Sequence, residues 1–137
     1  MATVTDTLRA LDVRVGPVEM RLPSEPALSR VLRLAASGVA ALAHRSVNEI
    51  EDIKIAVSEV FIALIEHGDG HQIAMQMSAE PDGFFIVGST LVAFFDVSHP
   101  DLQLCRTVLA DVCVDHSIEV NGGYTEIRAL VRRDEIA

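Results

Sequence analysis

Residues 46–67 read SVNEIEDIKIAVSEVFIALIEH and predict one long helix that is apolar nearly all round. Ser46 and Glu49 have the spacing of a capping box, in which each side chain satisfies a free amide at the helix start. The apolar residues are Ile50, Ile53, Val57, Val60 and Leu64 on one side and Ile55 and Ile62 on another. A helix with so little polar surface is expected to lie buried between layers, so this segment sets the architecture.

The segment before this helix predicts a strand followed by another helix. Residues 18–22 alternate apolar and charged side chains, which is the period of a half-buried strand, and Pro23 ends it. Ser24 is expected to cap a helix that runs through Ala43 and tolerates Pro26 in its first turn. Its apolar residues recur at helical spacing: Leu28, Val31, Leu32, Ala35, Val39 and Leu42.

The segment after the long helix predicts two hairpins separated by a third helix. Glycines at 68 and 70 end the long helix, and Asn121-Gly122-Gly123 favours a tight turn because these residues accept a positive φ. We expect strands at 73–77, 84–87, 117–120 and 124–131, and a helix that begins at Pro100-Asp101. Residues 88–100 have no clear period.

These elements predict an α+β fold, a two-layer α/β sandwich. The order is strand, helix, helix, strand, strand, helix, strand, strand, which favours a mixed, mostly antiparallel sheet with helices packed on one face. No internal repeat, low-complexity tract or linker interrupts the 137 residues, so we expect a single domain over residues 1–137.

The composition argues against nucleic-acid and membrane partners. The net charge is −9 and the eleven Lys and Arg residues are scattered, so the chain lacks the basic patch that phosphate backbones require. A basic protein surface is a better match for this charge. No apolar run approaches the ~18 residues that span a bilayer, and residues 1–6 are too polar for a signal peptide, so we expect a cytoplasmic protein.

Two cysteines, Cys105 and Cys113, lie eight residues apart in the segment that we expect to be the third helix. A rise of 1.5 Å per residue separates them by ~12 Å along a helix, too far for a disulfide within one chain. We therefore expect packed core thiols in a reducing compartment.

The sequence resembles the bacterial anti-sigma-factor serine kinases. Their histidine-kinase-like ATPase fold belongs to the GHKL superfamily, with gyrase, the heat-shock chaperone ATPase and the histidine kinases. The resemblance rests on LPS at 22–24, IEDIKIAVSE at 50–59 and NGGYTE at 121–126, and the order of elements matches over nearly the whole chain.

The resemblance implies a nucleotide site whose metal ligand is missing. In the family a Glu on the long helix orients the attacking hydroxyl, and an Asn four residues later holds Mg²⁺. Glu59 matches the first position, but Ala63 stands at the second and offers no oxygen to a hard cation. Glu59 is then a vestige of catalysis or a carboxylate in a surface stripe with Ala63 and His67, and we favour the stripe.

The family's base and phosphate motifs are also degenerate by this resemblance. Ser89 lies where an Asp of the family binds adenine, and Asp96 is the alternative adenine partner that we weigh and disfavour. Asp101 and Gln103 replace glycines that cradle phosphates at a helix start, so a carboxylate lies where an anion is bound in the family. We expect no cofactor, with Mg-ATP as the alternative.

Histidines and phenylalanines near these motifs have a structural interpretation and a functional one. His67 and His71 have zinc-ligand spacing, but the glycines between them break the helix, so we expect no metal site. Phe94 and Phe95 cannot both point inward in an extended segment. We expect Leu91, Val92, Phe94 and Phe95 to fill the empty nucleotide pocket rather than to form a partner-binding patch.

The function that the resemblance implies is regulation of transcription by protein–protein binding. We expect a pseudokinase, a homodimeric anti-sigma factor that switches partners between a sigma factor and an anti-anti-sigma protein of the STAS type. The resemblance places the dimer contact at the first strand and the first helix. The alternatives are an active ATP-dependent serine/threonine kinase that uses Glu59, and an adaptor domain of the same fold.

Overall fold

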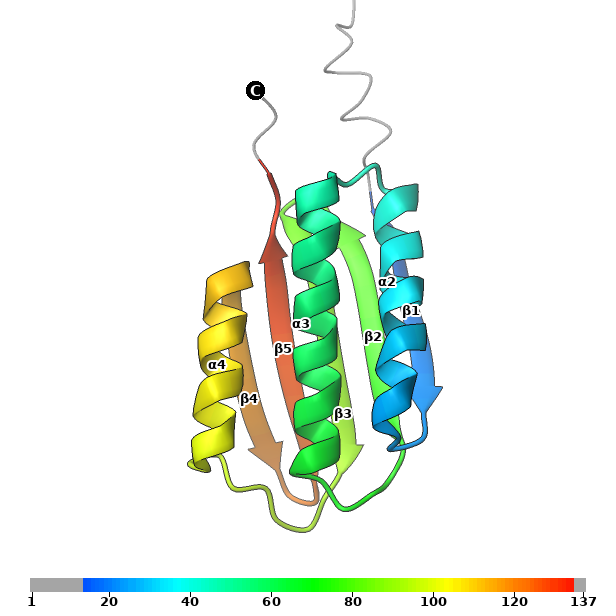
Figure 1. Ribbon diagram of the computed structural model, residues 1–137. Coiled ribbons are helices and arrows are strands. Elements are labelled where there is room, and N and C mark those ends of the chain that lie inside the picture. The colour runs from blue at the N-terminus through cyan, green and yellow to red at the C-terminus, as the bar shows by residue number, and fades with distance from the viewer. Residues whose placement is uncertain (1–13, 135–137) are drawn as a thin grey trace, which may run out of the picture.

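The computed structural model describes residues 14–134, so the sequence prediction for residues 1–6 lies outside the described part. Figure 1 shows helices packed side by side on one face of a single sheet. The elements in chain order are β1 (Val15–Leu22), the 3₁₀ turn η1 (Pro26–Leu28), α2 (Ser29–Leu42), α3 (Val47–Glu66), β2 (Ile73–Glu80), β3 (Gly83–Leu91), α4 (Pro100–Val112), β4 (Cys113–Asn121) and β5 (Tyr124–Arg132).

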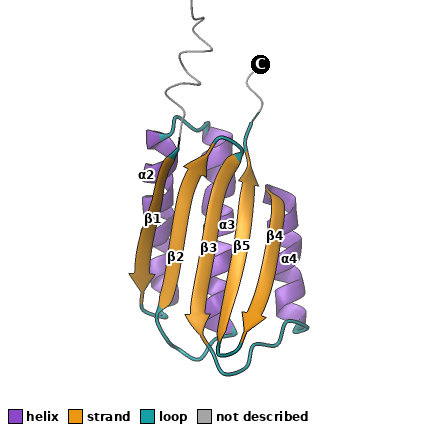
Figure 2. Ribbon diagram, turned by 180° about the vertical axis from the view of Figure 1, so that it is seen from behind, coloured by secondary structure: helices purple, strands orange, loops and turns teal. Residues whose placement is uncertain are grey.

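The sheet has five strands in the order β1-β2-β3-β5-β4. Every neighbouring pair is antiparallel, so the predicted α+β fold is confirmed, whereas the expected mixed sheet is wholly antiparallel. The other face of the sheet carries no helix of the described chain (Figure 2). Hairpins join β2 to β3 and β4 to β5, and the connection through α2 and α3 returns the chain antiparallel to β1. The connection through α4 does not pair β3 with β4, because β5 lies between them.

The helix α3 lies between α2 and α4, over the middle of the sheet (Figure 1). The capping box is confirmed: Ser46 Oγ accepts from the Glu49 amide, and the Glu49 carboxylate accepts from the Ser46 amide. Ile53 faces the sheet and is fully buried, but Ile55 is 43% exposed. The prediction that α3 is buried between layers is therefore wrong, because the helices form one layer with an outer face in solvent.

The start of the first helix also differs from the prediction. Pro26 opens the η1 turn, and α2 begins only at Ser29, with no side-chain cap at either start. Ser24 is therefore not the N-cap that the sequence predicted. Leu32 is buried against the sheet, whereas Leu42, which has the same helical period, is 70% exposed.

The strands extend further than their alternating patterns predicted, because the hydrogen-bonded ladder continues into residues with no clear period. The ladder between β3 and β5 pairs Leu91 with Tyr124, so β3 includes residues 88–91, the first four of the stretch that had no assignment. The last strand pair starts early as well, since Cys113 begins β4 rather than continuing α4. Cys105 and Cys113 are both free and buried, which confirms that they are packed thiols.

One glycine determines how closely α3 approaches the sheet. A Cβ at Gly88 of β3 would lie 2.6 Å from Val60 Cγ1, 2.8 Å from Leu64 Cδ1 and 2.9 Å from Met75 Sδ. A larger residue at this position would push α3 away from β3.

Across residues 14–134, no helix combines the length and the apolar character that crossing a bilayer demands.

Candidate functional site

A groove between α3 and α4 contains Glu59, Ala63, His67 and Asp101, four of the residues that the sequence singled out. We call it the α3–α4 groove; its volume is about 240 Å³ and its lining residues are Glu59, Ile62, Ala63, Glu66, His67, Asp101, Leu104 and Cys105. Four-residue spacing on α3 places Glu59, Ala63 and His67 on one face of the helix, as predicted. The first turn of α4 supplies Asp101 from the opposite wall.

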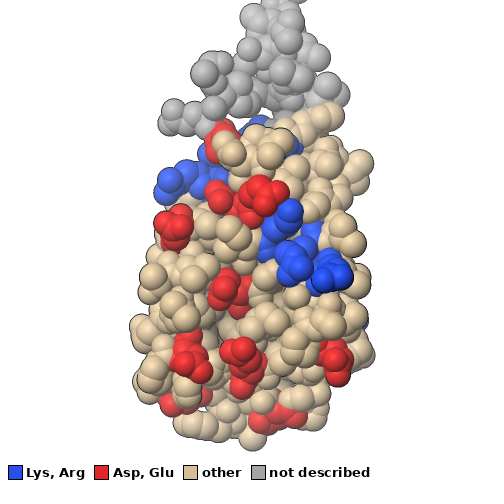
Figure 3. All heavy atoms as spheres, in the orientation of Figure 1, with Lys and Arg blue, Asp and Glu red and all other residues tan. Residues whose placement is uncertain are grey.

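The α3–α4 groove is acidic. Glu59, Glu66 and Asp101 all line it, and no Lys or Arg is among its lining residues. Burial raises the pKa of Glu59, and the nearby Glu66 carboxylate raises it further. Figure 3 shows acidic side chains spread over the lower part of this face, where the groove lies. An arrangement of this kind repels a polyanion and attracts a cation.

The wall of the groove also contains a thiol. Cys105 Sγ lies 3.9 Å from the main-chain oxygen of Glu59, and burial followed by the Glu59 carboxylate raises the pKa of this thiol to about 11. A thiol with this pKa is almost entirely protonated near neutral pH. Cys105 is therefore unsuited to act as a nucleophile.

The connection from β3 to α4 is short and held by main-chain contacts. The Val92 amide donates to the Gly123 carbonyl at 3.0 Å, and the Ala93 amide donates to Asp69 Oδ2 at 2.8 Å. Val92 and Phe95 are buried, whereas Phe94 is 77% exposed. The prediction that the apolar residues of this segment fill the nucleotide pocket requires each of them to be buried, as Val92 and Phe95 are. It is wrong for Phe94 and for Leu91, which is 61% exposed.

Asp96 serves the turn that precedes α4. Its Oδ1 accepts from the Ser98 amide at 3.0 Å and from the Ser98 hydroxyl at 2.7 Å. These hydrogen bonds lower the pKa of Asp96. Asp96 is not among the residues that line the α3–α4 groove, so the structure gives no support to its alternative role as an adenine partner.

At the mouth of the groove His67 meets a different histidine from the one that the sequence suggested. The ring centroids of His67 and His99 lie 4.9 Å apart, and His67 also packs edge-on against Phe95 at 5.9 Å. His71 instead lines a pocket on the uncovered sheet face. His67 and His71, which the sequence raised as a pair, therefore line different pockets.

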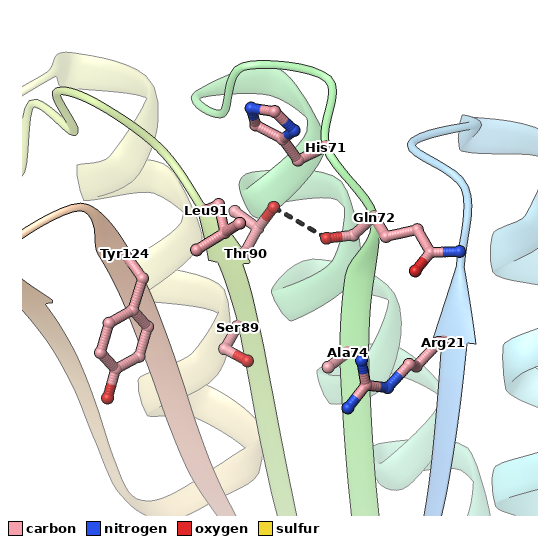
Figure 4. Close-up of a pocket in the computed structure, with 8 residues that line it drawn as sticks. All are labelled: Arg21, His71, Gln72, Ala74, Ser89, Thr90, Leu91 and Tyr124. Carbon is pink, nitrogen blue, oxygen red and sulfur yellow. Dashed lines mark hydrogen bonds between the residues drawn. The ribbon is translucent and has the colours of Figure 1, made fainter.

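Two of the predicted positions lie away from the groove. Ser89 lines a pocket of about 570 Å³ on the uncovered sheet face, together with Arg21 and Tyr124. Figure 4 shows the Arg21 and Tyr124 side chains on either side of Ser89. Gln103 is exposed on α4 and is not a lining residue of the groove. The structure thus brings together Glu59, Ala63 and Asp101, but not Ser89 or Gln103.

A second groove lies between α2 and α3, where the sequence gave no signal. Its volume is about 300 Å³, and Arg33 and Lys54 contribute the positive charge of its lining. Arg33 Nη1 donates at 3.2 Å to both Ser29 Oγ and Ser58 Oγ, which fixes the guanidinium across the two helices. Figure 3 shows basic side chains gathered where α2 and α3 lie side by side.

The outer face of α2 carries an apolar stripe, which we call the α2 stripe. Val31, Leu34 and Leu42 are 46%, 70% and 70% exposed, and Gly38 lies in line between the last two with no atom near its missing Cβ. Contiguous exposed apolar side chains of this kind commonly mark a contact surface for another protein.

Three helices on one face of a five-stranded antiparallel sheet define an α+β fold of two layers, with an acidic groove between α3 and α4. The crystal structure of the RsbU and RsbW domains of Rv1364c from Mycobacterium tuberculosis contains a region with this fold: it matches with a TM-score of 0.62 and 18% identity, over 87% of this chain and 32% of that chain. No family model matches the sequence.

The curated relatives are serine-protein kinases. The serine-protein kinase RsbW of Bacillus pumilus is 32% identical over 88 residues, which cover 60% of this chain and 54% of the relative. RsbW of Bacillus velezensis is 39% identical over 57 residues, covering 42% of this chain and 36% of the relative. The matches thus span between about a third and about a half of the relatives' length. The chain is related to the RsbW serine-protein kinases.

Proposed function

We propose that the chain is an anti-sigma-factor-type regulator that acts in the cytoplasm by protein–protein binding, without bound ATP. It switches between a sigma factor and an anti-anti-sigma protein of the STAS type. Its output then depends on the ratio of the two competitors and on their relative affinities, since a ligand shifts an equilibrium only by its differential affinity. The relation to RsbW supports the regulatory role.

The observation that carries the proposal is the chemistry of the α3–α4 groove. Ala63, buried in its wall, has no oxygen ligand for Mg²⁺, and Asp101 brings a negative charge to the start of α4. A triphosphate in this groove would face the carboxylates of Glu59, Glu66 and Asp101 with no lining cation to compensate. Coulomb repulsion at such short range opposes nucleotide binding.

An active kinase is the second candidate, because Glu59 retains the character of a catalytic carboxylate. It lies half-buried in the groove with a raised pKa, which is the environment of many general bases. Isothermal titration of the full chain with Mg-ATP separates the two candidates. We expect no saturable binding up to millimolar ATP, and micromolar binding would establish the kinase instead.

Competition between partners tests the regulatory role itself. Labelled chain is mixed with the sigma factors and STAS proteins of its own cell, and each candidate complex is challenged with the other class of partner. We expect one sigma factor and one STAS protein to bind in a mutually exclusive way, with no effect of Mg-ATP on either affinity. Binding to neither class, with the protein folded, would leave the adaptor role.

We further propose that residues 1–137 form one domain and that two copies associate through α2 and β1. The exposed α2 stripe supports this contact, and β1, which contacts α2 and lies at one edge of the sheet, carries the 37% exposed Val18. An apolar stripe next to an unpaired strand edge is a common basis for pairing of identical chains.

A further inference from the structure

We propose that His67, His99 and Asp101 bind a divalent transition-metal ion, Zn²⁺ in the first instance, at the mouth of the α3–α4 groove. Each of the three residues offers one ligand atom, and these atoms all lie within 4.8 Å of one another. The site is independent of the nucleotide: it uses two imidazoles and a carboxylate, a ligand set that suits Zn²⁺ rather than Mg²⁺.

The separations of the ligand atoms are close to those of a formed site. Ligands at ~2.1 Å from a tetrahedral Zn²⁺ lie roughly 3.4 Å apart. The three ligand atoms lie within 4.8 Å of one another, so they need to approach by at most about 1.4 Å to reach this separation. The two rings are already in edge-to-face contact, with centroids 4.9 Å apart and an interplanar angle of 60°. His99 Nδ1 is 3.8 Å from Asp101 Oδ2, which places the carboxylate at the same point.

The surroundings favour a cation. Glu66 adds a carboxylate in the same groove, and Asp96 is close enough to both imidazoles for each of them to lower its pKa. Phe95 packs edge-on against His67, with ring centroids 5.9 Å apart, and limits the directions in which the His67 ring can turn. Two anchored imidazoles with acidic neighbours lose less side-chain entropy on binding than free surface histidines do.

The position of the ligands couples metal binding to the fold. His67 is the C-cap of α3 and His99 is the N-cap of α4, so one ion joins the two helix ends across the β3–α4 connection. The Asp101 amide donates to His99 Nδ1 at 3.1 Å, so this nitrogen acts as an acceptor in the structure, and a metal ion needs the same lone pair. A metal ion bound to His99 Nδ1 replaces the hydrogen bond that caps α4. Because the ion also binds His67, it holds the end of α3 and the start of α4 together at the mouth of the groove.

Titration of the full chain with ZnCl₂ tests the site. We expect one ion per chain, and at least about tenfold weaker binding for His67→Gln and for His99→Gln. His71→Gln is the matched control, because His71 is exposed and lies four residues from His67 but outside the site, and it should bind Zn²⁺ like the unmodified protein. Equal losses in all three variants, or no saturable binding, would overturn the proposal.

A measurement on the unmodified protein keeps the test independent of how the variants fold. Histidine side-chain NMR signals are followed during Zn²⁺ addition, and circular dichroism confirms the fold of each variant. We expect the signals of His67 and His99 to shift together at one equivalent while those of His44 and His71 stay in place. If the NMR signals of all the histidines shift together, Zn²⁺ binds the surface non-specifically and the proposed site is wrong.

Discussion

Arg45 and Glu49 form an ion pair in the interior, with 3.6 Å between Arg45 Nη1 and Glu49 Oε2 and side-chain exposures of 0% and 8%. The Glu49 carboxylate also accepts from the Ser46 amide as part of the capping box, and Arg45 Nη2 donates to the carbonyl of Glu80. These contacts join the start of α3 to the end of β2. The position of α3, and with it the groove, depends on this pair.

Replacing Arg45 by Ala is expected to destabilise the fold by about 3 kcal/mol, because the Glu49 carboxylate is left buried without its partner. Urea unfolding at pH 7 measures the effect. Arg21→Ala is the matched control, since Arg21 faces Glu19 at 3.6 Å with both side chains more than half exposed. An exposed pair of this kind contributes less than about 1 kcal/mol. Similar losses in both variants would contradict the structural role of Arg45.

Gly88→Ala is expected to destabilise the protein by about 1–3 kcal/mol, because the new methyl group overlaps Val60, Leu64 and Met75 and forces α3 away from β3. Gly122→Ala in the last hairpin is the control, since its added Cβ meets no atom within 4 Å. Thermal unfolding of the two variants side by side measures the difference. Equal midpoints would mean that the contact between α3 and β3 can relax at little cost.

The sequence predicted correctly those features that depend on residues close together in the chain. It did not predict the features that depend on how the helices pack against one another and against the sheet. The capping box at Ser46 and Glu49 depends only on neighbouring residues, so it could be recognised directly. The exposure of Ile55 depends on α2 and α4 lying beside α3 in one layer, which no local pattern reveals. Gly88 likewise gains its role from a close approach of two segments.

Only the part of the candidate site that depends on spacing within one helix was predicted from the sequence. Helical spacing placed Glu59, Ala63 and His67 on one face, and the structure confirms this. The meeting of His67 with His99 was missed because His99 lies in the segment without a clear period, and its position depends on the path of the β3–α4 connection. Spacing along the chain says nothing of contacts made across such a connection.

The two thiols are expected to resist modification in the folded protein. Burial raises the pKa of Cys105 to about 11 and that of Cys113 to about 12, from an ordinary value of 9.0. At pH 8 the reactive thiolate is therefore far scarcer in the folded chain than in the unfolded one. Reaction with a disulfide reagent should be slow in buffer and fast in urea; fast reaction of either thiol in buffer would contradict its burial.

These two thiols also make the free energy of unfolding depend on pH in the alkaline range. Their pKa values are higher in the folded chain, so the unfolded chain loses its thiol protons first as the pH rises above 9. The stability that the protonated thiols contribute is present below pH 9 and is lost progressively towards pH 12. Cys113→Ala should weaken this dependence, which urea unfolding between pH 8 and pH 10.5 would detect as a shallower decline.

Glu59→Gln is expected to stabilise the fold by less than about 1 kcal/mol at pH 7, because it removes a charge that burial and Glu66 both disfavour. The raised pKa of Glu59 means that its contribution is favourable at low pH and is lost as the pH rises through that pKa. The advantage of the variant should therefore shrink from pH 7 to pH 4. An advantage that is the same at both values would argue against the raised pKa.

Leu34→Glu is expected to convert a dimer into a monomer, because it places a charge in the middle of the α2 stripe, where two copies would exclude water. Light scattering after size exclusion gives the mass directly. Leu104→Glu is the control: Leu104 on α4 is 67% exposed, against 70% for Leu34, but lies outside the stripe. We expect Leu104→Glu to keep the dimer mass. A monomeric unmodified protein at high concentration, or identical behaviour of the two variants, would show that the α2 stripe does not join two copies of the chain.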